Sequence, residues 1–177
     1  HLKVSNTEGI VQMVENNIID LGVVEAPVSN KNLVVDECRT DELVAIVPND
    51  HVLSSLDSIK IDELIQHPFI CREEGSGTRD VIVECLAQNG VDKKALKISM
   101  ELGSPEAIKG AVEAGMGISI ISSTTIDKEM RLKSLHPLHL EPPLTRPFSF
   151  VHQKQKFRQR VMEELLAFAK SYCHSRQ

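Results

Sequence analysis

The sequence has few aromatic residues and no tryptophan. Aromatic residues account for 3% of its 177 residues, with one tyrosine and five phenylalanines, whereas 41% of the chain is hydrophobic. The core must therefore consist mainly of valine, isoleucine, leucine and alanine. Such a composition suits buried parallel strands that are covered by helices, so we expect an α/β fold.

Long apolar runs are also missing. No stretch approaches the length that a helix needs to cross a membrane. The start, residues 1–4, resembles the end of a strand rather than a signal peptide, and the missing initiator methionine suggests a fragment of a longer polypeptide. We therefore expect a cytoplasmic chain with no membrane contact.

Cysteine is sparse, and its spacing carries no motif. The four cysteines are Cys38, Cys71, Cys85 and Cys173, and no two of them form a C-x-x-C pair. This pattern favours free thiols in a reducing compartment over a disulfide framework.

Excess positive charge is absent as well. Twenty basic and 25 acidic residues give a net charge of -5, which argues against a nucleic-acid-binding surface on this chain. The basic run 154–160 precedes an amphipathic segment and is expected to be a solvated helix start. His136 and His139 have a metal-like spacing, but Pro137 interrupts it and no carboxylate or cysteine flanks it closely. We expect no metal and no cofactor.

Hydrophobic periodicity alternates between strands and helices along the chain. Strands are expected at 1–4, 20–25, 33–35, 43–47, 69–71, 97–102, 118–121 and 148–151, with an edge strand and loop over 132–140 and an extended run over 142–147. Helices are expected at 5–18, 61–65, 78–89, 104–115, 122–129 and 157–172. Ser5 or Asn6 should cap the first of these, the third should end near Asn89-Gly90, and Pro105 should occupy the first helical position of the fourth. The first two strands should be parallel, joined by a right-handed crossover. Breaks at 48–50 and 142–147 predict two lobes with a cleft between them, residues 1–48 plus 148–177 and residues 49–147.

The most informative segment is 70–79, which should be a strand end, a turn and the first turn of a helix. Gly75 and Gly77 let backbone amides approach a ligand, and Ser76 and Thr78 can cap the helix or donate to a bound group. A helix N-terminus suits a small anion. An ordinary helix cap after a tight turn has the same pattern, so both readings stay open.

Enzymatic chemistry has little support in the sequence. The Gly-Ser-Gly-Thr turn lacks the lysine of a phosphate-binding loop and the spacing of a nucleophile elbow. No histidine has an obvious partner carboxylate. We expect no catalytic residues and no enzymatic activity.

Several motifs, taken in order, resemble the effector-binding domain of LysR-type transcriptional regulators. They are Asn6-Thr7-Glu8, Asp20 to Glu25, Asp41 to Pro48, Arg72 to Arg79, Glu101 to Lys109 and Ala114 to Ser119. Each is weak by itself, but their order and spacing are specific and cover nearly the whole chain. The GSGTR and ELGSPEAIK forms are most similar to the branch that senses sulfur and carbon metabolism.

The resemblance implies a two-lobed, periplasmic-binding-protein-like α/β fold with a central ligand cleft. It also implies an N-terminal truncation, because residues 1–4 align with the family's second strand, and a DNA-binding winged helix-turn-helix that this chain lacks. The implied partners are a small anionic effector, promoter DNA through that absent domain, and further copies in a homodimer or homotetramer.

Carried over residue by residue, the resemblance implies a set of effector-binding residues. They are Asn6, Thr7, Glu73, Gly75, Ser76, Gly77, Thr78, Gly103, Ser104, Gly117 and Ile118. For Ser104 we favour a simple N-cap, and for Thr78 the resemblance favours ligand contact.

The predicted function is effector sensing by a transcriptional regulator. A sulfite-like or sulfate-like oxyanion, or a small carboxylate, would bind between the lobes and alter DNA binding. The alternative is a solute-binding protein for transport, which shares the lobe design but would carry a signal peptide.

Overall fold

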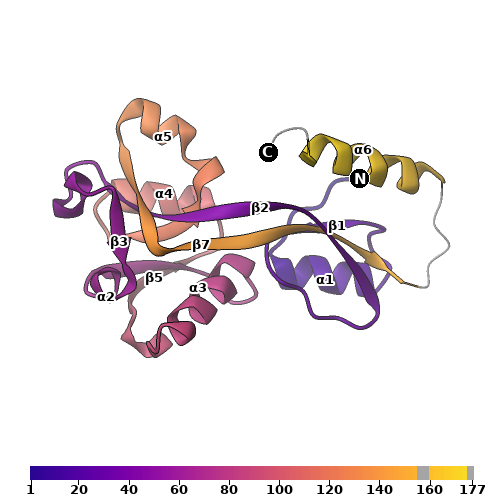
Figure 1. Cartoon of the computed structure of the whole chain (residues 1–177), viewed down its shortest axis with the longest axis horizontal. Helices are drawn as coiled ribbons and strands as arrows, with labels where there is room; N and C mark the ends of the chain where they lie inside the picture. The colour runs from indigo at the N-terminus through magenta and orange to yellow at the C-terminus, as the bar shows by residue number, and fades with distance from the viewer. Residues whose placement is uncertain (155–159, 175–177) are drawn as a thin grey trace. The chain divides into compact units, whose positions relative to one another are not determined.

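The computed structural model describes residues 1–154 and 160–174, and these divide into two compact units. The first unit comprises residues 1–40 and the described residues from 146 onward, and the second comprises residues 41–145. Two long strands, β2 (Leu33–Pro48) and β7 (Leu135–Gln153), belong to both units, and the chain passes from one to the other through them (Figure 1).

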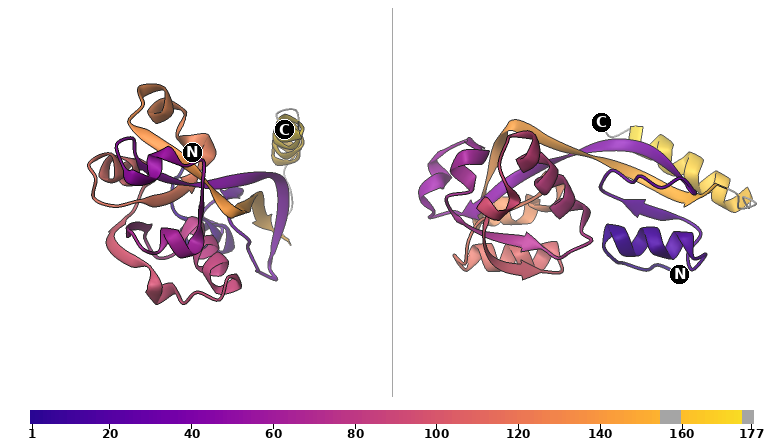
Figure 2. Two further views of the ribbon diagram at one scale, coloured as in Figure 1. Left: turned by 60° about the vertical axis from the view of Figure 1, so that its left-hand side comes forward. Right: turned by 90° about the horizontal axis from the view of Figure 1, so that it is seen from below.

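The first unit contains the helix α1 (Thr7–Glu15), the strand β1 (Gly22–Val24) and the helix α6 (Arg160–His174). β1 pairs antiparallel with β7, and α1 lies beside β1 (Figure 2). One apolar cluster joins Ile10 and Val14 of α1 to Val151 of β7. A second joins Leu166 of α6 to Phe150 of β7.

The second unit alternates short strands with helices. Its elements are the 3-10 helix η1 (Val52–Ser55), β3 (Ser58–Lys60), α2 (Ile61–Leu64), β4 (Pro68–Arg72), α3 (Gly77–Gln88), η2 (Lys93–Ala95), β5 (Lys97–Leu102), α4 (Pro105–Glu113), β6 (Ser119–Ser122), η3 (Ser123–Thr125) and α5 (Asp127–Leu132). Its core contains Ile46, Ile70, Ile108 and Ile121, as the scarcity of aromatic residues predicts.

Strand pairing fixes the directions of the elements in the second unit. β4 and β5 are parallel over the whole of β4, up to the pair Arg72 and Leu102. A parallel bridge between Phe69 and Ile118 connects β4 to the start of β6. β6 in turn pairs antiparallel with β2, from Ile46 opposite Ser119 to the end of β6. β5, β4 and β6 therefore all point in one direction.

Local signals predicted several helix ends correctly. Asn6 caps α1 by accepting a hydrogen bond from the Gly9 amide at 3.0 Å. Pro105 begins α4, and Asn89 follows the last residue of α3. In each case a capping side chain or a fixed proline φ favours a helix boundary regardless of tertiary context.

The predicted strand at residues 1–4 is wrong. Residues 1–6 are irregular, and Leu2 and Val4 are 91% and 90% exposed. A strand needs a neighbouring strand to pair with, and residues 1–4 pair with no strand among the described residues. The predicted parallel crossover to 20–25 is therefore wrong too, since β1 pairs antiparallel with β7.

Other predicted elements have different bounds. The expected strands at 33–35 and 43–47 form the single strand β2, because no glycine or proline interrupts the polar residues between them. From Leu135 onward, the segments 132–140, 142–147 and 148–151 likewise merge into β7, whose prolines lie in an otherwise continuous extended strand. The expected helix at 122–129 is η3 followed by α5.

Part of the expected terminal helix lies outside the described residues. Phe157 and most of the basic run 154–160 belong to that part, whereas α6 itself begins at Arg160. No helix among residues 1–154 and 160–174 is both long and apolar enough to cross a membrane.

Two glycines should respond oppositely to alanine. A Cβ on Gly22 would lie 2.5 Å from Ile10 Cγ2 and 2.8 Å from Val151 Cγ2, whereas one on Gly110, in α4, meets no atom within 4 Å. We expect Gly22→Ala to lower the free energy of unfolding by about 1–3 kcal/mol through overpacking. Gly110→Ala should raise it by about 0.5–1 kcal/mol, since alanine is the better helix former. Urea unfolding measures both, and equal effects of the two changes would contradict the packing described.

Candidate functional site

The turn between β4 and α3 has the glycine-dependent geometry that the sequence suggests. Gly75 has a φ of 79°, a left-handed conformation that favours glycine. Ser76 is the N-cap residue of α3, and Gly77 and Thr78 form its first turn. The first amides of a helix have no partner within the helix, so they can bind an acceptor placed at this end.

Ser76 and Thr78 are buried polar residues, with exposed fractions of 2% and 7%. The Ser76 side chain makes no capping hydrogen bond to the described residues of α3, although its backbone oxygen accepts from the Asp80 amide at 3.1 Å. The hydroxyl oxygen of a serine in the N-cap position usually accepts a hydrogen bond from an amide of the first helical turn. Here that hydroxyl is not used by the helix and can serve another acceptor or donor.

A second helix begins directly after the neighbouring strand. β5 ends at Leu102, Gly103 follows, and Ser104 caps α4 by accepting from the Ala107 amide at 3.2 Å. The predicted N-cap role of Ser104 is thus confirmed. Both Gly103 and Ser104 are exposed, so this helix start is open to solvent.

Parallel pairing brings the two helix starts to one edge of the unit. Arg72 and Leu102 are the last paired residues of β4 and β5, and α3 and α4 start within a few residues of them. Both helices present their partial positive ends there. In open α/β sheets, ligands bind at the carboxyl ends of parallel strands, so this edge is the candidate site.

A third hydroxyl-rich turn, which the sequence reasoning missed, follows β6. The Ser122 hydroxyl donates to Asp41 Oδ1 at 2.7 Å, and both residues are buried. Thr124 Oγ1 lies 2.9 Å from the same hydroxyl. Because β6 is parallel to β4, this turn belongs to the same edge. The run of four hydroxyl residues from 122 to 125, directly after an apolar strand, was the available signal.

Gly117 and Ile118 lie at the other end of β4. The Ile118 amide donates to Pro68 O at 2.8 Å, and its carbonyl accepts from the Ile70 amide at 2.8 Å. A Cβ on Gly117 would come within 2.6 Å of Pro68 O. The structure therefore gives these two predicted residues a close backbone packing role at the amino end of β4, away from Ser76 and Ser104.

Asn6 and Thr7 belong to the first unit. They occupy the cap and the first position of α1, and both are partly buried. The structure places them at a helix start like those of Ser76 and Ser104, but in a separate compact unit.

The two arginines near the α3 turn each form an ion pair with a glutamate. Arg72 and Glu73 form a two-point pair, with Nε to Oε2 at 2.8 Å and Nη2 to Oε1 at 3.0 Å. Arg79 Nη1 lies 2.5 Å from Glu101 Oε2 and donates to Arg72 O at 3.0 Å. Glu73, which the resemblance assigns to the effector site, thus pairs with Arg72. Since carboxylates neutralise both guanidinium groups, the helix ends supply the remaining positive potential.

A buried lysine holds α4 in place. Lys109 is 5% exposed, and its Nζ lies 2.9 Å from Glu106 Oε1, 3.0 Å from Glu129 Oε1 and 2.9 Å from Thr125 O. Burial by itself lowers the pKa of Lys109, but the two carboxylates outweigh it and raise that pKa. Burial likewise raises the pKa of Glu129, yet the hydrogen bond and charge of Lys109 bring it below its ordinary value.

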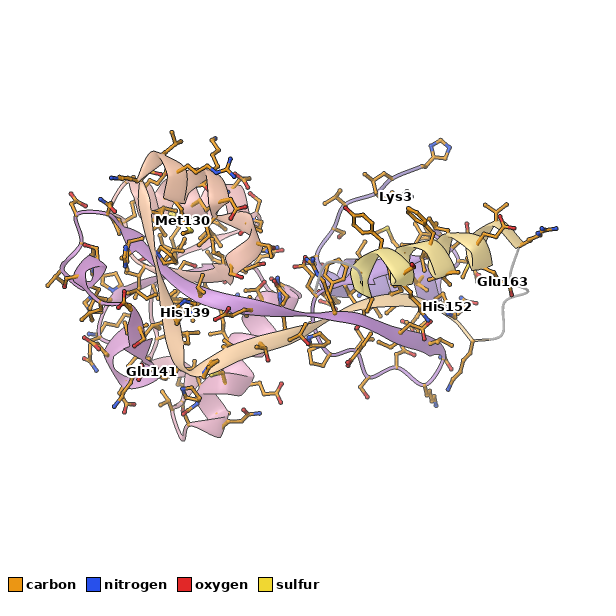
Figure 3. The ribbon with its side chains drawn as sticks, turned by 45° about the horizontal axis from the view of Figure 1, so that its top comes forward. Lys3, Met130, His139, Glu141, His152 and Glu163 are labelled. Carbon is orange, nitrogen blue, oxygen red and sulfur yellow. The ribbon has the colours of Figure 1, made fainter. Side chains whose placement is uncertain are left out.

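Two histidines have carboxylate partners that are remote in sequence, which corrects the expectation that none has one. His139 Nδ1 lies 2.8 Å from Glu42 Oε1, and the buried His152 has Nε2 3.6 Å from Asp36 Oδ2. Figure 3 labels the two histidines. Sequence separation conceals both pairs. No group of three potential metal ligands occurs among the described residues.

The first unit also has a groove of about 580 Å³. Apolar side chains line much of it, including Leu2, Ile18, Leu21, Val23 and Leu165. None of the predicted effector residues belongs to its lining, so the groove is a feature separate from the helix starts described above.

The chain matches the family model of the LysR substrate binding domain over residues 1–174. It is 33% identical over 177 residues to a probable RuBisCO transcriptional regulator of Cyanidium caldarium, covering 98% of this chain and 54% of the relative. It is 32% identical over 181 residues to the RuBisCO operon transcriptional regulator of Allochromatium vinosum, covering 97% and 58%. The chain thus spans about half the length of these curated relatives.

Solved structures show the same fold. The regulatory domain of CcmR from Synechocystis PCC6803, in complex with 2-PG, aligns with a TM-score of 0.87 and 32% identity, covering 98% of this chain and 82% of that one. The effector binding domain of QuiR aligns with a TM-score of 0.85 and 22% identity, covering 97% and 79%. The expected two-lobed, periplasmic-binding-protein-like α/β fold is thereby confirmed.

Replacing Lys109 should cost much of the stability of the second unit. In Lys109→Met, the buried Glu129 carboxylate would lose its cation, and such a loss costs about 3–5 kcal/mol. Chemical denaturation should show this decrease, while Lys93→Met, on an exposed lysine, should change the free energy of unfolding by less than about 0.5 kcal/mol. A small effect of Lys109→Met would contradict the role assigned to this lysine.

The same cluster should make stability depend on pH. Because the pKa of Glu129 in the folded state is below its ordinary value of 4.5, its contribution is present above pH 4.5 and is lost as the pH falls through the folded-state pKa. We expect the melting temperature to decrease on acidification below pH 4.5, and to decrease less steeply in Glu129→Gln. If the melting temperatures of the wild-type protein and Glu129→Gln fall equally steeply with pH, other carboxylates must account for the loss of stability in acid.

Proposed function

Because the chain belongs to the LysR substrate-binding domain family, we propose that it is the effector-sensing part of a DNA-binding transcriptional regulator. In this proposal a small anionic metabolite binds at the carboxyl ends of β4 and β5, and binding alters how the whole protein engages promoter DNA. The transport alternative loses its support, since the curated relatives from Cyanidium caldarium and Allochromatium vinosum are named as transcriptional regulators.

One observation carries the binding site. Two helices, α3 and α4, start immediately after two paired parallel strands, and the buried Ser76 hydroxyl at the first of them does not cap its helix. Backbone amides at two helix starts and the Ser76 hydroxyl, at one edge, suit an oxygen-rich anion. Arg72 and Arg79 are each paired with a glutamate, which supports recognition of the anion by the helix starts rather than by free guanidinium groups.

The relatives narrow the chemistry of the effector. Both curated relatives are named as RuBisCO transcriptional regulators, and the CcmR domain at 32% identity is in complex with 2-PG. We therefore favour an anion of carbon metabolism, with 2-PG or a small carboxylate as first candidates. Nothing in these relatives supports a sulfur oxyanion.

Transmission requires that the effector bind one conformation more tightly than another, since equal affinity for both would shift no equilibrium. The DNA contact is proposed for a part of the full-length regulator outside these 177 residues, and the functional assembly is proposed to be a homodimer or homotetramer.

In the full-length regulator, the affinity for promoter DNA should change when the effector is added. An effector that binds without changing DNA affinity would separate binding from regulation.

The sharpest test removes one hydroxyl from the α3 turn. Thr78→Val keeps the shape of the buried side chain but removes its hydroxyl, and Ser76→Ala removes the other. We expect each change to weaken 2-PG binding about 10- to 150-fold, the equivalent of one lost hydrogen bond to a charged group. Calorimetric titration with 2-PG, phosphate, sulfate and short carboxylates measures the affinity and selectivity.

Ser54→Ala is the matched control. Ser54 lies in η1, which follows β2, and its hydroxyl donates to His51 O at 2.7 Å. That end of β2 pairs with the amino end of β6, so Ser54 is at the opposite edge from the candidate site. Ser54→Ala should therefore leave the affinity for the anion unchanged. Wild-type affinity in both Thr78→Val and Ser76→Ala would overturn the site, whereas no binding of any anion by the wild-type protein would overturn the proposed effector class.

A further inference from the structure

The two cysteines of the first unit meet in one apolar cluster. Cys38 lies on β2 and is 4% exposed, and Cys173 lies in the last turn of α6 and is partly exposed. Both contact the cluster that contains Phe150 and Leu166. Two thiols that are 135 positions apart in the chain are thus brought together by the packing of α6.

Burial and the neighbouring Cys173 both act on the Cys38 thiol. Burial, and next a hydrogen bond with the neighbouring Cys173 thiol, raise the pKa of Cys38 to about 11. Cys38 Sγ also donates to Phe148 O at 3.2 Å. Cys38 is therefore a protonated, shielded thiol at neutral pH, whereas Cys173 is the member of the pair that solvent reaches.

We propose that Cys38 and Cys173 are a redox modification site, at which a peroxide converts the thiol pair into a disulfide that links α6 to β2. The Cys173 sulfur attacks the peroxide, its O–O bond breaks, and Cys173 becomes a sulfenic acid with release of water. The Cys38 sulfur then displaces the hydroxyl of the sulfenic acid as a second water. The two thiols lose two electrons in total, and the peroxide gains them.

The position of the pair gives the bond a structural effect. α6 packs through Leu166, and Lys170 Nζ pairs with Asp36 Oδ2 at 3.1 Å. Val161 and Phe168, in contrast, are 74% and 69% exposed. A helix whose side chains are exposed along one face can separate from β2 locally, and a covalent bond in its last turn would prevent this. The inference is independent of the effector and of its site.

Oxidation of the chain with hydrogen peroxide under native conditions tests the proposal. Of the four thiols, two should remain titratable after denaturation, and the intact mass should fall by two hydrogen atoms. Peptide mapping should show Cys38 joined to Cys173, and dithiothreitol should restore all four thiols. The oxidised chain should melt about 5–15 °C higher than the reduced one, since the bond closes a long loop.

Variants distinguish this pair from the other cysteines. Cys173→Ser, at a partly exposed position, should abolish the loss of hydrogen mass and the rise in melting temperature, and Cys38→Ala should do the same. Cys85→Ala removes a buried thiol of the second unit and should leave both readouts intact. Four free thiols after oxidation, a bond that includes Cys71 or Cys85, or a bond between two chains would overturn the proposal.

Discussion

The parallel hydrogen bonding of β4 to β5 is the constraint on which the candidate site depends. Two strands that run the same way end at the same edge, so the helices that follow them must begin at that edge. The bridge from β4 to β6 adds a third turn to it. Amides and hydroxyls from three separate parts of the sequence thereby meet without any single motif encoding the site.

Three cations near the candidate site are paired with carboxylates of the second unit. Arg72 pairs with Glu73, Arg79 with Glu101, and Lys109 with two carboxylates. These pairs orient the backbone around the helix starts and anchor α4 to α5. At the edge itself the helix ends contribute partial positive charges, which are fixed in direction and need no rearrangement before an anion binds.

The sequence predicted the helix boundaries that depend on neighbouring residues in the chain. The cap at Asn6, the start of α4 at Pro105 and the end of α3 near Asn89 were correct because each is set by residues within one helical turn. The strand at residues 1–4 was wrong because a strand depends on a partner that local pattern does not reveal. The Asp41–Ser122 bond was missed for the same reason, since 81 positions separate its two residues.

Gly75 is constrained to remain glycine, whereas the side chains that follow it in the turn can change. Its φ of 79° admits a side chain only at a cost, whereas the backbone at Ser76 and Thr78 has an ordinary helix-start conformation that requires no particular residue. Evolution could therefore change the specificity of this edge by altering two side chains while the turn that presents them stays the same. A regulator built in this way can acquire a new signal molecule without having to acquire a new fold.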